Sequence, residues 1–214
     1  MYSLNLTIKS LSVALVLTSA SSHAATVINP SFELNPVADG GNAGGSFTGW
    51  VSTGGDAGYQ NLPGTTFTPL PTSGDHNAFT NFGTGVLSQV TSEVITAGNT
   101  YTFTVDVGQL SAFTGSTGTI RIFGSTGGPG VSIAQVFGIA PTSGSYLSNQ
   151  TVSYTALTSG DPFAGQSVGI ALISQAGTQV IYDNVRFDVG AVPEPSSILL
   201  GGLGALALLR RRRI

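Results

Sequence analysis

One acidic residue stands out as a candidate for chemistry. The segment 179–188 alternates apolar and polar residues, which predicts a strand whose buried face carries Ile181, Asp183, Val185 and Phe187. A carboxylate on a core-facing surface is costly unless it is hydrogen-bonded, paired or bound to metal. Arg186 falls on the opposite face of this predicted strand and is a poor partner for Asp183. Two interpretations stay open: Asp183 ligates calcium, or it accepts backbone hydrogen bonds.

Catalytic patterns are weak. His76, preceded by Asp75, is the only histidine after the first 25 residues, so a Ser-His-Asp site would have to use it. No Gly-x-Ser-x-Gly elbow precedes a helix, and Asp75-His76 is typical of a solvated turn. Paired-carboxylate glycosidase chemistry needs two acids across a cleft, and no pair is singled out. The sequence therefore predicts no catalytic residue and a protein that is not an enzyme; the alternative is a secreted glycan-active hydrolase.

Aromatic side chains in the loop-rich first half could form a platform for a sugar. Tyr59, between Gly58 and Gln60, is the better exposed candidate for ligand binding. Trp50 is a second candidate, although its position after Gly49 also suits a core residue. The remaining aromatic candidates are Phe47, Phe67, Phe79 and Phe82.

The body that must position these residues reads as all-β. The clearest strand is 100–107, with Tyr101, Phe103, Val105 and Val107 on one face and threonines and Asp106 on the other. Further strands are expected at 27–33 (an edge strand broken by Pro30), 76–82, 86–94, 119–123, 131–137, 150–157, 167–174 and 179–188. Eight or nine strands with glycine-rich turns predict an antiparallel jelly roll or β-sandwich over residues 26–190.

Charge and cysteine content exclude several classes of function. Residues 26–190 carry nine acidic residues and two arginines, a net charge of −7 with His76 neutral. Such a surface lacks the basic footprint of a nucleic-acid-binding protein. The sequence contains no cysteine, which excludes zinc–thiolate sites and cysteine nucleophiles.

Residues 1–25 are typical of a secretory signal peptide for Sec-type export. Lys9 gives a weakly positive start, Leu11–Ala20 is apolar, and small residues allow cleavage after Ala24 or Ala25.

Residues 191–214 have three parts. Val192, Pro193, Glu194 and Pro195 begin an extended segment, an uncharged apolar run spans 198–209, and Arg210, Arg211, Arg212 and Arg213 form a basic stop-transfer block. A helix over residues 196–209 would be about 21 Å long, against about 30 Å of hydrocarbon core. Such a short transmembrane helix suits a transient anchor better than a permanent one.

This tail resembles the PEP-CTERM sorting signal of Gram-negative bacteria. The resemblance implies processing by an exosortase-type membrane protease, transient anchoring in the inner membrane and delivery of the body to the cell surface or the exopolysaccharide matrix. An ordinary single-span anchor is the alternative.

A second resemblance covers most of the body. The segments 29–33, 49–50, 87–89, 97–101 and 182–185 look like those of galactose-binding-like jelly rolls, a group that includes many carbohydrate-binding modules. The resemblance implies one structural calcium ion held by Glu33 and Asp183. It also implies binding of a glycan, with exopolysaccharide as the partner.

Overall fold

The computed structural model describes residues 22–62, 68–126 and 130–191, and all the statements on structure below concern these ranges. They belong to one compact unit, Ser21–Ala191. The predicted signal peptide, apart from its last residues, and the predicted C-terminal helix lie outside the described residues. No helix among the described residues is long and apolar enough to cross a membrane.

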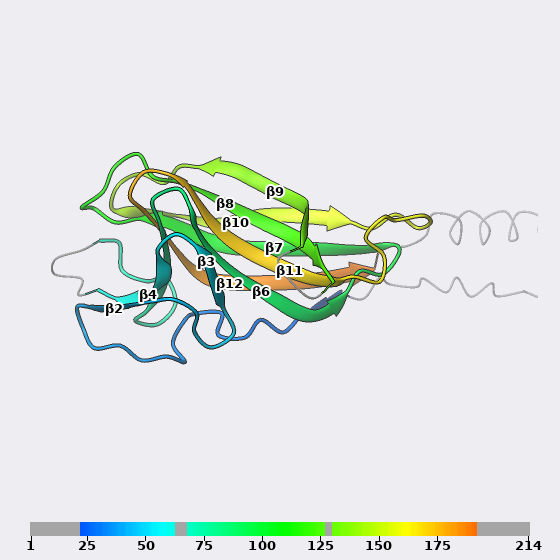
Figure 1. Ribbon diagram of the computed structural model, residues 1–214, viewed down its shortest axis with the longest axis horizontal. Helices are drawn as coiled ribbons and strands as arrows, with labels where there is room; N and C mark the ends of the chain where they lie inside the picture. The colour runs from blue at the N-terminus through cyan, green and yellow to red at the C-terminus, as the bar shows by residue number, and fades with distance from the viewer. Residues whose placement is uncertain (1–21, 63–67, 127–129, 192–214) are drawn as a thin grey trace, which may run out of the picture. The chain divides into compact units, whose positions relative to one another are not determined.

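The described chain is a two-sheet antiparallel sandwich, which confirms the all-β prediction (Figure 1). A seven-stranded sheet has the order β10-β7-β12-β5-β4-β2, with β1 also paired to β12. A five-stranded sheet has the order β3-β6-β11-β8-β9. The strands are β1 (Ser22–Ala24), β2 (Gly41–Gly44), β3 (Val51–Gly54), β4 (Ala57–Asn61), β5 (Asn77–Asn81), β6 (Gly85–Val94), β7 (Asn99–Gln109), β8 (Thr117–Ser125), β9 (Val131–Ile139), β10 (Ser145–Thr155), β11 (Ser167–Ala176) and β12 (Gln179–Ala191).

The strands from β5 onward match the sequence prediction, whereas the first part of the chain differs from it. Residues 27–33 form turns rather than an edge strand, because Asn29 and Phe32 adopt positive φ angles of 54° and 65° around Pro30. The strands β1 to β4 were not predicted. They are three to five residues long and rich in glycine and alanine, so they carry little alternation to detect.

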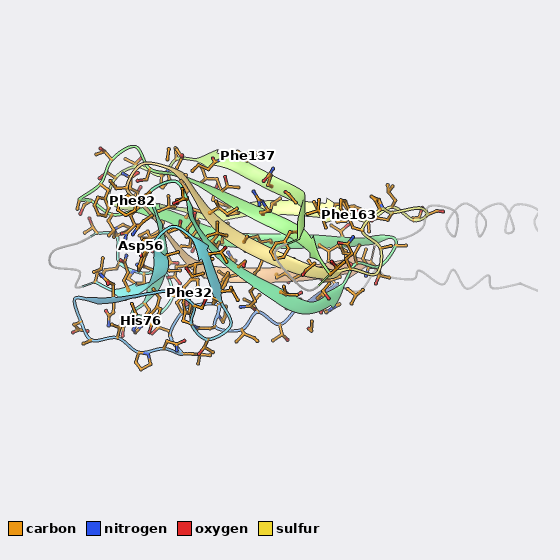
Figure 2. The ribbon with its side chains drawn as sticks, in the orientation of Figure 1. Phe32, Asp56, His76, Phe82, Phe137 and Phe163 are labelled. Atoms are coloured by element: carbon orange, nitrogen blue, oxygen red, sulfur yellow. The ribbon has the colours of Figure 1, made fainter. Side chains whose placement is uncertain are left out.

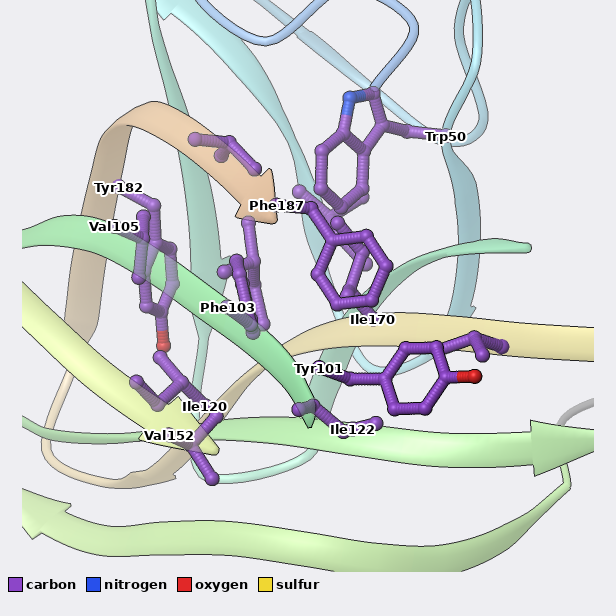
Figure 3. Close-up of a cluster of buried hydrophobic side chains, with 14 of the residues drawn as sticks. Trp50, Tyr101, Phe103, Val105, Ile120, Ile122, Val152, Ile170, Tyr182 and Phe187 are labelled. Carbon is purple, nitrogen blue, oxygen red and sulfur yellow. The ribbon is translucent and has the colours of Figure 1, made fainter. Parts of the chain in front are cut away.

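The core lies between the two sheets, where the inward residues of β7 pack against those of β8 and β11 (Figure 3). Tyr101, Phe103, Val105 and Val107 of β7 are all fully buried, as their alternation predicted. Trp50 packs tilted against Phe32 with ring centroids 5.5 Å apart. The inward side chains of β7 and β12 belong to this core. The outward side chains of the same two strands form the candidate site.

A β-bulge in β12 decides which side chains face outward. The pairing of β12 with β7 shifts between Asp183 and Arg186, and Asn184 has a φ of 53°. Val180 and Tyr182 before the bulge, and Val185 and Phe187 after it, all belong to the core between the sheets. The extra residue therefore resets the alternation, as a bulge does.

Two predictions about β12 were consequently wrong. Asp183 does not share a face with Val185 and Phe187; it lies with Ile181 on the outer face of the seven-stranded sheet. Arg186 is not on the opposite face from Asp183, because the bulge returns it to the outer side, where its guanidinium lies 4.0 Å from Asp106.

Candidate functional site

Two acidic side chains from neighbouring strands meet on the outer face of the seven-stranded sheet. Asp106 of β7 and Asp183 of β12 are direct cross-strand partners. They are 3% and 0% exposed, respectively. Like charges at such positions repel, so a buried carboxyl pair favours the retention of a proton by one member.

Asp183 is held by the segment between β4 and β5. Its Oδ2 accepts hydrogen bonds from the Ser73 backbone N–H (2.7 Å) and lies 3.1 Å from the Thr72 hydroxyl. Its Oδ1 accepts from the Asn184 N–H at 2.7 Å. Burial raises the pKa of Asp183 from 3.8 to about 6, although these hydrogen bonds oppose the rise. Asp183 is therefore an acid that can hold or release a proton near neutral pH.

Asp106 lies between two bulges. Its Oδ1 accepts from the backbone N–H of Asn149, at an irregularity in β10, at 2.7 Å. Its Oδ2 accepts from the Asn184 side-chain amide (3.2 Å) and from the Thr72 hydroxyl (2.8 Å). Asn149 and Asn184 both have positive φ, a conformation that asparagine tolerates well, so the two bulges aim donors at one carboxyl group.

The Thr72 hydroxyl connects the two acids. It lies within hydrogen-bonding distance of both carboxyl groups, yet it has a single hydrogen to donate. If Asp183 carries a proton, Asp183 donates to Thr72 and Thr72 donates to Asp106. Thr72 is exposed, so this short chain of hydrogen bonds reaches the protein surface.

An apolar cluster adjoins the acid pair. We call Phe79, Leu110, Ile181, Leu62, Phe113 and Tyr146 the outer cluster. Gly108 leaves room for it, because a Cβ there would come within 2.7 Å of the Tyr146 ring and 2.9 Å of Ile181. The buried Tyr146 hydroxyl has no hydrogen-bond partner among the described residues. Burial, followed by the charges of Asp183 and Asp106, raises the pKa of Tyr146 well above its usual value.

A shallow cavity of about 480 Å³ lies along β12, and neither acid of the pair lines it. Its lining comes from residues 24–27, Pro30 and residues 185–188. Arg186 connects the cavity with the acid pair, because it lines the cavity and its guanidinium also lies 4.0 Å from Asp106. The volume falls in the range typical of small-molecule sites, which is about 300–1,000 Å³.

Glu33 lies in a separate hydrogen-bond network. Its Oε1 accepts from the backbone N–H groups of Asp75 and His76, at 2.8 and 2.7 Å, and its Oε2 lies 2.6 Å from His76 Nδ1. The Val37 N–H donates to His76 Nε2 at 3.2 Å, so Nδ1 carries the hydrogen that goes to Glu33. Since both ring nitrogens are engaged, His76 is placed to hold loops together.

Glu33 and Asp183, the predicted calcium ligands, hold the same segment from two sides. Asp183 accepts from Ser73, and Glu33 accepts from Asp75 and His76. N–H donors occupy lone pairs that a calcium ion would need, so this arrangement fits a hydrogen-bonded clamp better than an oxygen shell. No group of three or more potential metal ligands occurs among the described residues. The calcium ion stays a prediction.

The two predicted ligand-binding aromatic residues lie apart from the acid pair. Trp50 is 1% exposed and donates its indole N–H to the Asn29 carbonyl at 3.2 Å, so it is a core residue and cannot serve as an open platform. Tyr59 is half-buried, with its ring centroid 4.8 Å from that of Phe47 and 6.4 Å from that of His76.

Sequence reasoning missed Asp106, Thr72 and Tyr146 as site residues. A usable signal existed for Asp106, which is the only acidic residue on the threonine-rich face of its strand.

Comparison with known proteins identifies the family. A model of the HpiC1 cyclase family matches residues 23–188, which is most of the chain. The chain belongs to the HpiC1 cyclase family. This membership overturns the prediction that the protein is not an enzyme, because the family is one of cyclases. A second model, the PEP-CTERM protein-sorting motif, matches residues 191–213 and confirms the interpretation of the tail. That motif indicates export and processing by an exosortase membrane protein.

Solved structures of cyclases and of carbohydrate-binding modules are similar to this chain in fold. A cyclase from Fischerella sp. TAU has a TM-score of 0.68 at 18% identity, covering 81% of this chain and 100% of that one. A cyclase from the same organism in complex with 4-(1H-indol-3-yl)butan-2-one has a TM-score of 0.66 at 18% identity, covering 80% and 100%. The CBM22-1 xylan-binding domain of Paenibacillus barcinonensis Xyn10C has a TM-score of 0.50 at 12% identity, covering 85% and 100%. No curated protein matched the sequence. The likenesses in structure establish a jelly-roll fold shared with carbohydrate-binding modules.

Proposed function

We propose that this protein is an exported cyclase in which Asp183 is the catalytic acid. The observation that carries the proposal is the buried pair of Asp183 and Asp106, in which burial raises the pKa of Asp183 to about 6. A general acid works best when its pKa lies near the working pH, and Asp183 meets that condition.

The proposed step is an acid-catalysed ring closure. Because Asp183 is fully buried, its proton passes through the exposed Thr72 hydroxyl: Thr72 gives its hydrogen to a carbon–carbon double bond of the substrate and takes the proton of Asp183. The resulting cation is attacked by a second π bond of the same molecule, which forms the ring. Loss of a proton from the cyclised cation to the Asp183 carboxylate restores the acid. The product is an isomer of the substrate. The neighbouring Asp106 carboxyl would stabilise positive charge on the cation.

The surroundings of Asp183 favour an apolar substrate that contains an aromatic ring. The outer cluster supplies phenylalanine, leucine and isoleucine side chains next to the acid pair, and a ligand that enters it would meet the Tyr146 hydroxyl, which lies near the Asn77 side chain without a hydrogen bond of ordinary geometry. An indole, with a flat ring and a single N–H, has this character. The ligand in the similar Fischerella cyclase is an indole, which agrees with the proposal.

The tail supports a place of action outside the cytoplasm. We propose that exosortase processing releases the body to the cell surface or to the extracellular matrix. The acidic, cysteine-free body is compatible with either place.

The test uses an indole substrate in deuterated buffer. We expect the purified full chain to convert a 3-alkenylindole that bears a second double bond into a cyclic isomer containing one deuterium. Asp183→Asn should lower this rate by about 10²–10⁴-fold, the usual contribution of a general acid. Asp39→Asn, at an exposed acidic position that belongs neither to the cavity nor to the acid pair, is the matched control and should keep the wild-type rate.

Binding of 4-(1H-indol-3-yl)butan-2-one, followed by calorimetry, tests the substrate class independently of turnover. Wild-type turnover rates in Asp183→Asn would contradict the role of the acid. Absence of both binding and turnover in the wild-type protein would contradict the proposed function.

A further inference from the structure

The first described strand points to a processing site at the N-terminal end of the body. β1 pairs antiparallel with the end of β12, with Ser22 opposite Gly190 and Ala24 opposite Asp188 (Figure 1). All three residues of β1 are exposed, and none belongs to a hydrophobic core cluster. The strand therefore covers the edge of β12 without contributing a buried side chain.

Ala25, the next residue, is part of the packed fold. It is 8% exposed and belongs to the core between the sheets, and its backbone N–H donates to the Phe187 carbonyl at 2.8 Å. Further along the same segment, Phe32 is fully buried (Figure 2). The segment from Ala25 to Phe32 is thus anchored at both ends. The boundary between residues that the core excludes and residues that it includes falls at the peptide bond between Ala24 and Ala25.

The sequence around this bond suits a signal peptidase. Such enzymes accept small residues at the last position of the leader and two positions before it. A cut after Ala24 places Ala24 and Ser22 at these positions, whereas a cut after Ala25 places the larger His23 at the second of them. The leader pattern and the burial boundary therefore select the same bond.

The folded structure closes this bond to a protease. A peptide bond enters a protease cleft within an extended segment whose backbone groups are free to pair with the enzyme. Here Ala24 is paired with Asp188 on β12, and the N–H of Ala25 is bonded to Phe187. β12 is the last strand of the body in chain order, so it is the last to emerge during export. The bond is therefore accessible until β12 emerges and pairs with β1.

We propose that signal peptidase hydrolyses the Ala24–Ala25 peptide bond before β12 pairs with β1, and that this pairing makes an uncut, folded chain resistant to the enzyme. One water molecule is added across the bond, which leaves a carboxylate on Ala24 and an ammonium group on Ala25. The ammonium group keeps the hydrogen bond to the Phe187 carbonyl. Ala25 and Asp188 line the same cavity, so a carboxylate lies near the new positive charge. The proposal is independent of the cyclase activity.

The first test identifies the N-terminus of the full chain after export from a Gram-negative host. Sequencing of the exported protein should find Ala25 as its first residue. Ala24→Leu should stay uncut at this bond, because leucine is too large for the last leader position, whereas the matched control Ala24→Ser should be cut like wild type. Position 24 is exposed, so neither substitution should alter the fold. A mature chain that begins at Thr26, or wild-type cleavage of Ala24→Leu, would overturn the assignment of this bond.

The second test times the cut against folding. The unfolded full chain is diluted from urea into detergent micelles, and purified signal peptidase is added either at the start of refolding or after its completion. We expect at least about tenfold less cleavage in the second case, because the bond is then reached only when the pairing of β1 with β12 opens. Equal cleavage in the two cases would overturn the protection by β12. Absence of cleavage in both cases would show that the bond is not a substrate of the enzyme.

The third test measures what each side of the bond contributes to the fold, in chains that begin at Ser22, Ala25 or Thr26. Loss of β1 removes an exposed strand and the 3.5 Å contact of His23 with Glu93, which contributes little at a surface. The first two chains should therefore have similar melting temperatures. The chain that begins at Thr26 should melt about 2–4 °C lower, because it lacks the buried Ala25 and its hydrogen bond. Equal melting of the chains that begin at Ala25 and Thr26 would contradict the boundary.

Discussion

Asp106 on β7 and Asp183 on β12 are direct cross-strand partners, and the hydroxyl of Thr72 lies within hydrogen-bonding distance of both. This triangle brings together residues that are 34 and 111 positions apart along the chain. It places a carboxyl group with a raised pKa beside a second carboxyl group, beneath one exposed side chain. In this member of the HpiC1 cyclase family, the pairing of β7 with β12 therefore brings two buried carboxyl groups together.

The titration of Asp183 should be visible in the stability of the protein. Its pKa is about 6 in the folded state and 3.8 in the unfolded state, so the folded state binds more protons between these values. The contribution is fully present below pH 3.8 and is lost as the pH rises through 6; over that window it amounts to roughly 3 kcal/mol at most. This term should make the unfolding free energy of wild type, measured in urea, fall as the pH rises from 4 to 7. Asp183→Asn should flatten that part of the profile, whereas an unchanged profile in the variant would show that Asp183 is not the titrating group.

Tyr146→Phe should separate ligand binding from folding. The Tyr146 hydroxyl is buried near the Asn77 side chain and forms no hydrogen bond of ordinary geometry, so its removal should leave the melting temperature unchanged or raise it slightly. If this hydroxyl bonds the polar group of a ligand, affinity for 4-(1H-indol-3-yl)butan-2-one should fall about tenfold, which is the value of one hydrogen bond. Calorimetry on the two proteins is the measurement. Equal affinities of wild type and Tyr146→Phe for this ligand would show that the Tyr146 hydroxyl does not contact it.

Gly108→Ala should damage the outer cluster. The new methyl group would meet the Tyr146 ring at 2.7 Å and Ile181 at 2.9 Å, and a well-packed site cannot absorb that overlap freely. We expect a loss of about 1–3 kcal/mol in unfolding free energy, together with weaker ligand binding. Gly190→Ala in β12 is the matched control, because its methyl group would lie at an ordinary 3.5 Å from Ser22. Similar losses in both variants would show that replacing any glycine in a strand is costly, and that the overlap with the Tyr146 ring is not the cause.

The predicted calcium ion can be tested through Glu33. If calcium binds at Glu33 and Asp183, excess chelator should lower the melting temperature of wild type, and Glu33→Gln should abolish this response. Glu33→Gln should in any case cost about 1–2 kcal/mol, because an amide cannot accept the hydrogen that His76 Nδ1 donates at its Oε2 position. An unchanged melting curve of wild type in excess chelator would contradict the calcium hypothesis.

The sequence by itself determined the class of fold, the main strands and the sorting tail. Period-2 alternation in 100–107 identified β7 and its buried face, because side chains alternate strictly along a regular strand. The Pro-Glu-Pro segment, the short apolar run and the arginine block carry the resemblance to the PEP-CTERM motif, and all three lie within one short stretch of sequence.

Only the tertiary structure decided where the acid pair lies. A strand's alternation predicts its faces until a bulge inserts a residue. Because of the bulge at Asn184, Asp183 lies on the outer face together with Arg186, whereas the pattern placed Asp183 on the buried face with Val185 and Phe187. A left-handed residue such as Asn184 becomes a bulge only in the context of its partner strand. The meeting of Asp106, Asp183 and Thr72 depends on the pairing of β7 with β12 and on a loop that crosses both, and contacts of that range have no signature in local sequence.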